Sequence, residues 1–255
     1  MPGDGPFRKT AGFATWPPPT STVSPATLAR EMMALGQATL SPPAFPEDAA
    51  RGAGQPVIVI PGFLAPDMST SRLRDFLVRQ NFAPMAWTGG INLGPMRRVM
   101  AALKDQICQT ADRAGRPVSL VGVSLGGTIA RQAAKNCPDS IARVITVVSP
   151  IRMPVVTPLA PLAQAAALLW DAQEVRDLAR IAEPPPVPLT AIISRDDGII
   201  EWERAPRGDP PGRGRGSGRS AHVDLHQPGG SAHHCRQAGA HLIARLVSEH
   251  LAASI

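Results

Sequence analysis

The sequence lacks the features that mark membrane-spanning, secreted and metal-binding proteins. No apolar stretch is long enough, or free enough of proline, to span a bilayer. The N-terminus has no basic region followed by an apolar one, which is the pattern of a secretory signal peptide. The cysteines Cys108, Cys137 and Cys235 are scattered and odd in number, so we expect reduced thiols without metal spacing. These absences predict a cytoplasmic protein with no integral membrane segment.

Aromatic residues are also scarce, and tyrosine is absent altogether. The net charge of +6 and the isoelectric point near 10.2 raise the question of nucleic-acid binding. However, six arginines and three acids after Arg204 supply half of that charge. The other basic residues are spread over expected helices without interleaved aromatic residues. This pattern is typical of solvated surfaces, and we expect no nucleic-acid partner.

The length and composition fit one α/β domain with unlike segments at its ends. With 255 residues, 44% of them apolar, the chain can bury a substantial core and is not a disordered protein. Residues 1–54 are rich in proline and alanine and predict an extension with one helical piece, Ser24 to Leu40. Residues 55–204 carry a regular alternation of elements. Residues 205–255 form an atypical Gly/Arg-rich segment with a terminal helix.

Strand-like and helix-like segments alternate through residues 55–204. Short apolar runs predict strands, and apolar side chains three or four positions apart predict helices. The expected strands are Pro56–Ile60, Ala83–Trp87, Pro117–Val123, Ile145–Ser149 and Leu189–Ser194. The expected helices begin near Ser69 to Ser71, run from Met96 to Ile107, and run from Gly126 to Asn136. Such alternation predicts a mainly parallel sheet with helices on both faces.

Residues 151–188 form an apolar, proline-interrupted insertion between the last two expected strands. An insertion at that point can overhang the edge of the sheet and act as a cap or lid. A surface crossover helix with an ordinary buried face explains the same pattern equally well. Both interpretations stay open.

The most informative motif is Gly122-Val123-Ser124-Leu125-Gly126, which lies between an expected strand and an expected helix. A strand–turn–helix with glycine on both sides of a serine is the setting of a nucleophile elbow. In such an elbow the backbone is strained and the hydroxyl is exposed at the end of the strand. Ser124 is therefore the candidate nucleophile, and the alternative is an ordinary strand-to-helix turn.

A second segment, Pro61-Gly62-Phe63-Leu64, follows the first buried strand at the same edge of a parallel sheet. Gly62 allows the backbone to turn so that the Phe63 N–H faces the serine. The Leu125 N–H is expected to point at the same space. Two such donors form an oxyanion hole, which stabilises the tetrahedral intermediate of acyl transfer.

A carboxylate that orients a histidine base is expected after the strand Leu189–Ser194. Arg195-Asp196-Asp197-Gly198 provides two candidates. We favour Asp197, which directly precedes Gly-Ile-Ile, and place Asp196 second. If Asp-Asp-Gly is merely a turn, the site has no acid.

Pro-Gly-Phe-Leu at 61–64, Gly-Val-Ser-Leu-Gly-Gly at 122–127 and Ser-Arg-Asp-Asp-Gly-Ile-Ile at 194–200 resemble the α/β-hydrolase superfamily, and within it the small lipase- and esterase-like proteins. The resemblance runs from about Pro56 to Arg204. It implies hydrolysis of a small-molecule or lipid ester through an acyl-enzyme, with Ser124 as nucleophile and no metal or cofactor. It also implies the chain order serine, acid, histidine. The acyl group, the acceptor and the oligomeric state stay open.

All six histidines lie at position 222 or later, where the chain departs from this resemblance. The family has a last strand, a Gly-x-His turn and an amphipathic helix there, whereas this chain has a Gly/Arg-rich stretch without a strand pattern. Shifting the codons for residues 226–238 by one base permits an amphipathic helix, Thr-Asn-Pro-Ala-Val-Leu-Arg-Ile-Ile-Ala-Asp-Arg-Leu. The same shift permits Gly-Ala-His at 219–221 and a stop codon before Ile243. We therefore hypothesise a frameshift. The alternative is a genuine Gly/Arg-rich loop followed by a helix from Ala240 to Ala253.

His222 is the closest candidate base, one position from the histidine that the shifted frame permits. A one-residue offset in a Gly/Arg-rich loop does not favour a hydrogen bond between an imidazole and Ser124. We predict that residues 205–221 form no regular strand and that the chain as written is weakly active or inactive. A serine esterase and a catalytically impaired hydrolase-fold protein are the two functional hypotheses.

Overall fold

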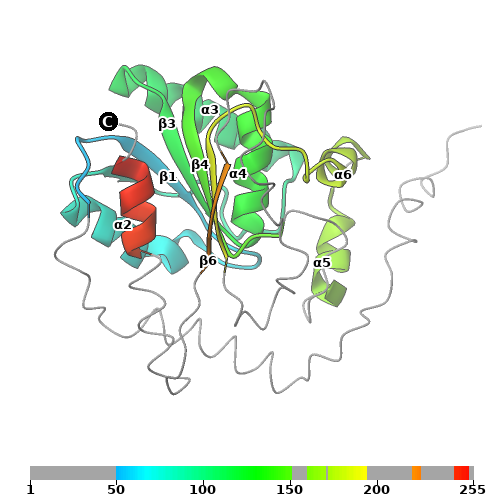
Figure 1. The fold of residues 1–255 in the computed structure, drawn as a ribbon. Helices are drawn as coiled ribbons and strands as arrows, with labels where there is room; N and C mark the ends of the chain where they lie inside the picture. Colours follow the sequence, from blue (N-terminus) through cyan, green and yellow to red (C-terminus); the bar gives the residue numbers. More distant parts are fainter. Residues whose placement is uncertain (1–49, 151–159, 171, 194–219, 225–243, 253–255) are drawn as a thin grey trace, which may run out of the picture.

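The computed structural model describes residues 50–150, 160–170, 172–193, 220–224 and 244–252. Its centre is a six-stranded sheet in the order β2-β1-β3-β4-β5-β6, and every neighbouring pair is parallel. Helices cover both faces of the sheet (Figure 1). The predicted α/β fold is therefore confirmed. The helical piece expected at Ser24 to Leu40 lies outside the described residues.

The strands form where the sequence places short apolar runs. Their bounds are β1 Pro56–Ile60, β2 Ala83–Met85, β3 Val118–Val123, β4 Ile141–Val147, β5 Leu189–Ile193 and β6 Ser220–Asp224. All five residues of β1 are buried, as expected of a strand covered on both faces. β4 begins four residues earlier than predicted, because the half-buried Ala142 and Arg143 interrupt the apolar run. β2 ends two residues earlier than predicted.

The helices between β1 and β4 begin close to the predicted positions. The helical elements are η2 Asp67–Thr70, α2 Ser71–Arg79, α3 Arg97–Ala114, α4 Leu125–Asn136, η3 Pro138–Ser140, α5 Ala160–Ala167, α6 Ala172–Ala179 and a helix over residues 244–252. α3 ends at Ala114, and the Gly115 that follows it has a φ of 62°, in the left-handed region that favours glycine at the end of a helix. In the described part of the chain, no helix combines the length and the apolar character needed to cross a bilayer.

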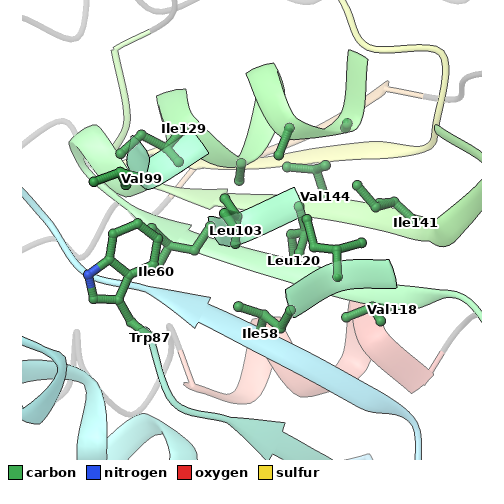
Figure 2. Close-up of a cluster of buried hydrophobic side chains, with 14 of the residues drawn as sticks. Ile58, Ile60, Trp87, Val99, Leu103, Val118, Leu120, Ile129, Ile141 and Val144 are labelled. Atoms are coloured by element: carbon green, nitrogen blue, oxygen red, sulfur yellow. The ribbon is translucent and has the colours of Figure 1, made fainter. Parts of the chain in front are cut away.

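Alternate strand residues enter two cores, one on each face of the sheet. Ile58 and Ile60 of β1 pack with α3 and α4, whereas Val57 and Val59 pack with α2 and the helix over residues 244–252. Figure 2 shows the first of these cores, where side chains of β1, β3 and β4 lie beside those of α3 and α4. Successive strand residues point to opposite faces. The same short strands therefore build both cores.

The insertion between β4 and β5 combines a crossover helix with a contact near the edge of the sheet. α6 packs on α4, where the buried Arg131 guanidinium donates to the Ile181 carbonyl at 2.7 Å. Lys135 Nζ donates to the Arg180 carbonyl at 2.8 Å. The carboxyl end of a helix carries a partial negative charge, which stabilises cations placed beside it. Burial lowers the pKa of Arg131 to about 10, which leaves it charged at neutral pH. Trp170, between α5 and α6, instead contacts the loop after β2.

The region after β5 contains more regular structure than the sequence predicted. β6 begins at Ser220 and pairs with β5, so the prediction of no regular strand over residues 205–221 is wrong at its last two positions. The reason is that an edge strand is held by backbone hydrogen bonds and needs no strong apolar pattern. Residues 205–219 lie outside the described part of the chain.

The terminal helix over residues 244–252 buries an apolar face. Ala244, Val247 and Leu251 enter the core on the α2 side of the sheet. This helix lies within the Ala240–Ala253 segment of the alternative without a frameshift, and it favours that alternative. The frameshift stays a hypothesis that the gene sequence tests.

Candidate active site

Ser124 occupies a strained turn between β3 and α4, at the carboxyl edge of the sheet. Its φ of 50° and ψ of −122° lie outside the regions that non-glycine residues normally adopt. The Ser124 N–H donates to the Val147 carbonyl of β4 at 2.9 Å, and the Gly127 N–H donates to the Ser124 carbonyl at 2.9 Å. The residue is half-buried. The turn is therefore held from both sides while the serine keeps contact with solvent.

Close backbone contacts require the glycines of this motif. A Cβ on Gly122 would lie 2.3 Å from the Gly126 carbonyl oxygen, and a Cβ on Gly126 would lie 2.3 Å from that of Ile60. A Cβ on Gly127 would lie 2.0 Å from Ser149 Oγ. Side chains do not tolerate such distances, so only glycine lets α4 start directly against β1 and β3. The glycine pattern reflects tight packing as well as the turn.

Backbone strain is concentrated at this edge of the sheet. Within the described residues, a positive φ occurs at four non-glycine residues, Leu64, Asn81, Ser124 and Val148. Asn81 follows α2, and asparagine tolerates the left-handed region. The other three follow the carboxyl ends of β1, β3 and β4, which are adjacent strands. Such strain costs roughly 1–3 kcal/mol per residue and clusters at functional sites.

The loop over residues 61–65, called here the 61–65 loop, passes beside Ser124. A Cβ on Gly62 would lie 3.4 Å from the Ser124 Cβ, which is van der Waals contact. Leu125 is the first residue of α4, so its N–H has no acceptor within the helix. In the described part of the chain, neither the Leu125 N–H nor the Phe63 N–H makes a hydrogen bond. Both predicted donors therefore come from segments that adjoin Ser124.

Asn92, which the sequence reasoning missed, holds the 61–65 loop. It is 1% exposed; its Nδ2 donates to the Pro61 carbonyl at 2.7 Å, and its Oδ1 accepts from the Gly94 N–H at 3.0 Å. The Asn92 carbonyl accepts from the Leu64 N–H at 2.8 Å, and the Asn92 N–H donates to the Ala65 carbonyl at 3.1 Å. The signal in the sequence is weak, since an asparagine shortly before Gly-Pro is typical of any turn.

The candidate acids Asp196 and Asp197 lie outside the described residues, three and four positions after β5 ends at Ile193. β5 is two strands from β3 and runs parallel to it. The carboxyl end of β5 therefore faces the same edge as Ser124. The order of the strands suits an acid after β5.

His222 lies within β6 and not beyond it. It pairs with Ala191 of β5, one position before the level that Val123 occupies at the end of β3. β6 is three strands from β3, which at 4.7–4.9 Å per strand is about 14 Å between backbones. This separation exceeds what an imidazole and a serine hydroxyl can bridge with a hydrogen bond. The register of β6 does not bring His222 and Ser124 together.

His250, the other histidine in the described residues, lies near the amino ends of the strands, whereas Ser124 lies at their carboxyl ends. Its Nδ1 lies 2.8 Å from the Leu246 carbonyl oxygen in the terminal helix, and its own carbonyl accepts a hydrogen bond from Arg143. Arg143 is near the amino end of β4, whereas Ser124 follows the carboxyl end of β3. His250 is therefore not placed to act as a base for Ser124. The other four histidines lie outside the described residues.

A cavity of about 320 Å³ lies between α3, α4 and α6. Thr128, one helical turn after Ser124, lines it together with Arg97 and Gln132, but Ser124 does not. The cavity is a neighbour of the serine site and not the site itself. Within the part of the chain that the structure describes, no group of three or more His, Cys, Asp or Glu side chains is placed to hold a metal ion.

Comparisons with known proteins identify the fold. Residues 96–181 match the family model described as alpha/beta hydrolase fold. A monoacylglycerol lipase from Paleococcus ferrophilus has a TM-score of 0.54 and 14% identity, over 81% of this chain and 97% of the lipase. The thermostable carboxylesterase EstE1, cloned from a metagenomic library, has a TM-score of 0.51 and 12% identity, over 91% of this chain and 98% of the esterase. No curated protein sequence matches this chain significantly.

The segment that matches the family model begins next to α3 and extends past α6, so it contains the turn at Ser124. Because the identities to the lipase and the esterase are low, these two similarities show a shared fold and nothing more. Both similarities agree with the parallel sheet and its helices on two faces. The chain therefore has the α/β-hydrolase fold.

Proposed function

We propose that this chain is a serine hydrolase that cleaves carboxylic esters through an acyl-enzyme intermediate. The observation that carries the proposal is Ser124, a half-buried serine at positive φ between a buried strand and the start of a helix. Strain of this kind is costly, and a nucleophile elbow is the arrangement in which it exposes a hydroxyl. A monoacylglycerol lipase and a carboxylesterase share the fold, which supports a small-molecule or lipid ester as substrate.

In the proposed reaction, Ser124 Oγ attacks the ester carbonyl carbon while a base takes its proton. The carbonyl oxygen becomes an oxyanion that accepts hydrogen bonds from the N–H groups of Phe63 and Leu125. Removing one such donor typically costs about 3 kcal/mol of barrier. The intermediate collapses, the alcohol leaves with the proton held by the base, and the acyl group stays on Ser124. Water or another hydroxyl then releases the acyl group by the same steps in reverse.

Asp197 is the proposed orienting carboxylate, and His222 is the proposed base. A carboxylate that accepts a hydrogen bond from the imidazole fixes its tautomer and stabilises its protonated form. Because His222 pairs within β6, its use requires this edge strand to shift or detach. His226 is the alternative, since it comes two positions after β6 ends and the chain order of the superfamily has a histidine there. His222→Ala and His226→Ala, compared in one esterase assay, decide between them.

A second candidate function is a hydrolase-fold protein without turnover. The position of His222 inside β6, about 14 Å across the sheet from Ser124, favours it. Such a protein keeps the fold and the elbow but has no base to activate the serine. Its Ser124 would then react no faster than an ordinary serine hydroxyl.

Labelling with a fluorophosphonate separates these two functions. An activated Ser124 attacks the phosphorus, expels fluoride and carries the phosphonyl group, which is located by mass spectrometry of the Ser124 peptide. We expect this adduct in the folded chain and its absence in Ser124→Ala and in heat-denatured protein. A folded chain that stays unlabelled supports the second candidate.

A further inference from the structure

One buried residue, Asn92, fastens the 61–65 loop on both sides of its centre. The side-chain amide binds the Pro61 carbonyl, and the Asn92 backbone exchanges hydrogen bonds with Leu64 and Ala65. Phe63 lies between these fixed points and makes none of these bonds. The position of the Phe63 N–H is therefore determined by what Asn92 holds before and after it.

The loop depends on this support because it is strained and crowded. Leu64 has a φ of 60°, a conformation that non-glycine residues rarely adopt. A Cβ on Gly126 would lie 2.5 Å from the Pro61 carbonyl oxygen, so this carbonyl is pressed against the first turn of α4. Within the described residues, Asn92 Nδ2 is the donor that satisfies it. Loss of that donor would leave a buried carbonyl without a partner, which favours a shift of the loop.

Asn92 also connects the loop to the insertion between β4 and β5. Its Oδ1 accepts from the Gly94 N–H, and a Cβ on Gly94 would lie 2.2 Å from the indole Cζ2 of Trp170. Trp170 is 8% exposed, and its Nε1 donates to the Leu93 carbonyl at 3.0 Å. Residues 92–94 thus join the insertion to the loop beside Ser124. Asn92 is therefore held between the 61–65 loop on one side and the segment that contacts Trp170 on the other.

We propose that Asn92 is a positioning residue for the oxyanion hole: it holds the 61–65 loop so that the Phe63 N–H meets the developing oxyanion. This inference rests on the proposed function, because it takes the Phe63 N–H as a donor in ester hydrolysis. Asn92 acts through the loop and does not contact the substrate. Oxyanion donors stabilise charge that exists only in the transition state and its intermediate. Their displacement therefore lowers turnover and leaves substrate binding nearly unchanged.

The variant Asn92→Asp removes the donor to Pro61 and keeps both the size of the side chain and the acceptor for Gly94. Asn81→Asp is the matched control. Asn81 Nδ2 also donates to a backbone carbonyl, that of Gly52 at 2.8 Å. Both residues precede the amino ends of β1 and β2, whereas Ser124 follows the carboxyl end of β3. Asn92→Ala removes the donor without adding a charge. All variants are compared with the full chain at temperatures at which circular dichroism shows each to be folded.

We expect Asn92→Asp and Asn92→Ala to lower kcat for p-nitrophenyl acetate ~10- to 100-fold and to change KM less than ~2-fold. The rate of fluorophosphonate labelling at Ser124 should fall by a similar factor. Amide hydrogen exchange in peptides that cover residues 61–65 should accelerate in both variants. Asn81→Asp should leave kcat, the labelling rate and exchange in this loop at the values of the unmutated chain.

Three results overturn the inference and leave the proposed function standing. One is unchanged turnover and labelling in Asn92→Asp while Ser124→Ala abolishes both. The second is unchanged exchange over residues 61–65, which is measured without turnover and applies to a slow enzyme as well. A rise in KM with faster exchange throughout the molecule also overturns it, because Asn92 is then only structural. Turnover that survives Ser124→Ala refutes the proposed function instead.

Discussion

The two halves of the proposed catalytic machinery are built differently. The nucleophile half, Ser124 with the 61–65 loop, is packed between the ends of β1, β3 and β4, and glycines there bring backbone against backbone within distances that no side chain tolerates. The acid–base half consists of Asp197 after β5 and His222 within β6, where the structure describes a five-residue edge strand and, further along the chain, a terminal helix. A nucleophile elbow is thus encoded by a short local pattern. A base must be delivered by a segment that reaches back across three strands.

The largest expected effect is the loss of ester hydrolysis when the nucleophile half is disabled. Ser124→Ala should reduce hydrolysis of short p-nitrophenyl esters by several orders of magnitude, roughly 10³-fold or more, because the members of a catalytic triad act as a unit. The rate is measured on the folded variant beside the unmutated chain and a no-enzyme control. Activity that survives the substitution would remove Ser124 from the site.

The next largest effect assigns the carboxylate of the acid–base half. Asp197→Asn should impair kcat far more than Asp196→Asn, by roughly 10²-fold or more, because one carboxylate orients the imidazole and stabilises its protonated form. The two variants have the same change of charge at adjacent positions, so each is the control for the other. The reverse order of rates would move the assignment to Asp196.

A restored reading frame tests whether the acid–base half is complete in the chain as written. The frameshift hypothesis predicts that a single-base correction upstream of the codons for 219–221 raises the esterase rate and the melting temperature, because it supplies the Gly-Ala-His turn and the helix of the superfamily. The structured β6 and the buried helix over residues 244–252 favour the alternative without a frameshift. If the chain as written equals the corrected chain in both activity and Tm, the frameshift hypothesis is wrong.

The smallest effect concerns stability in the nucleophile half. Gly126→Ala forces a Cβ to 2.3 Å from the Ile60 carbonyl oxygen and should lower the free energy of unfolding by roughly 3 kcal/mol. Gly62→Ala places its Cβ 3.4 Å from the Ser124 Cβ, which is ordinary contact, and should change it by less than about 1 kcal/mol. Urea unfolding of both variants measures the difference. Equal losses would show that the backbone contact at Gly126 relaxes freely.

The strand–turn–helix around Ser124 could be predicted from the sequence because its determinants are close together along the chain. Gly122, Ser124 and Gly126 belong to one strand–turn–helix unit, and the buried runs around them set the strand and the helix. The 61–65 loop follows from the rule that loops after parallel strands meet at one edge. The fold class followed from the same alternation of strands and helices.

Other features could not be read, because they depend on contacts between distant segments. The role of Asn92 arises from its burial against Pro61, a partner 31 positions earlier in the chain. The start of β4 was missed because Arg143 looks like a surface residue until the terminal helix supplies the His250 carbonyl. β6 was missed because backbone pairing with β5 holds it. The catalytic roles of Ser124, Asp197 and His222 stay predictions.

The measurement that tests the central claim most directly is to trap the acyl-enzyme. The chain is mixed with p-nitrophenyl acetate, quenched in acid within the first turnover and digested, and the peptides are analysed by mass spectrometry. The account predicts one added acetyl group on the peptide that contains Ser124, and none on that peptide in Ser124→Ala. Hydrolysis that proceeds without this adduct, or with the acetyl group on another residue, would contradict the proposal that Ser124 is the nucleophile of a serine esterase.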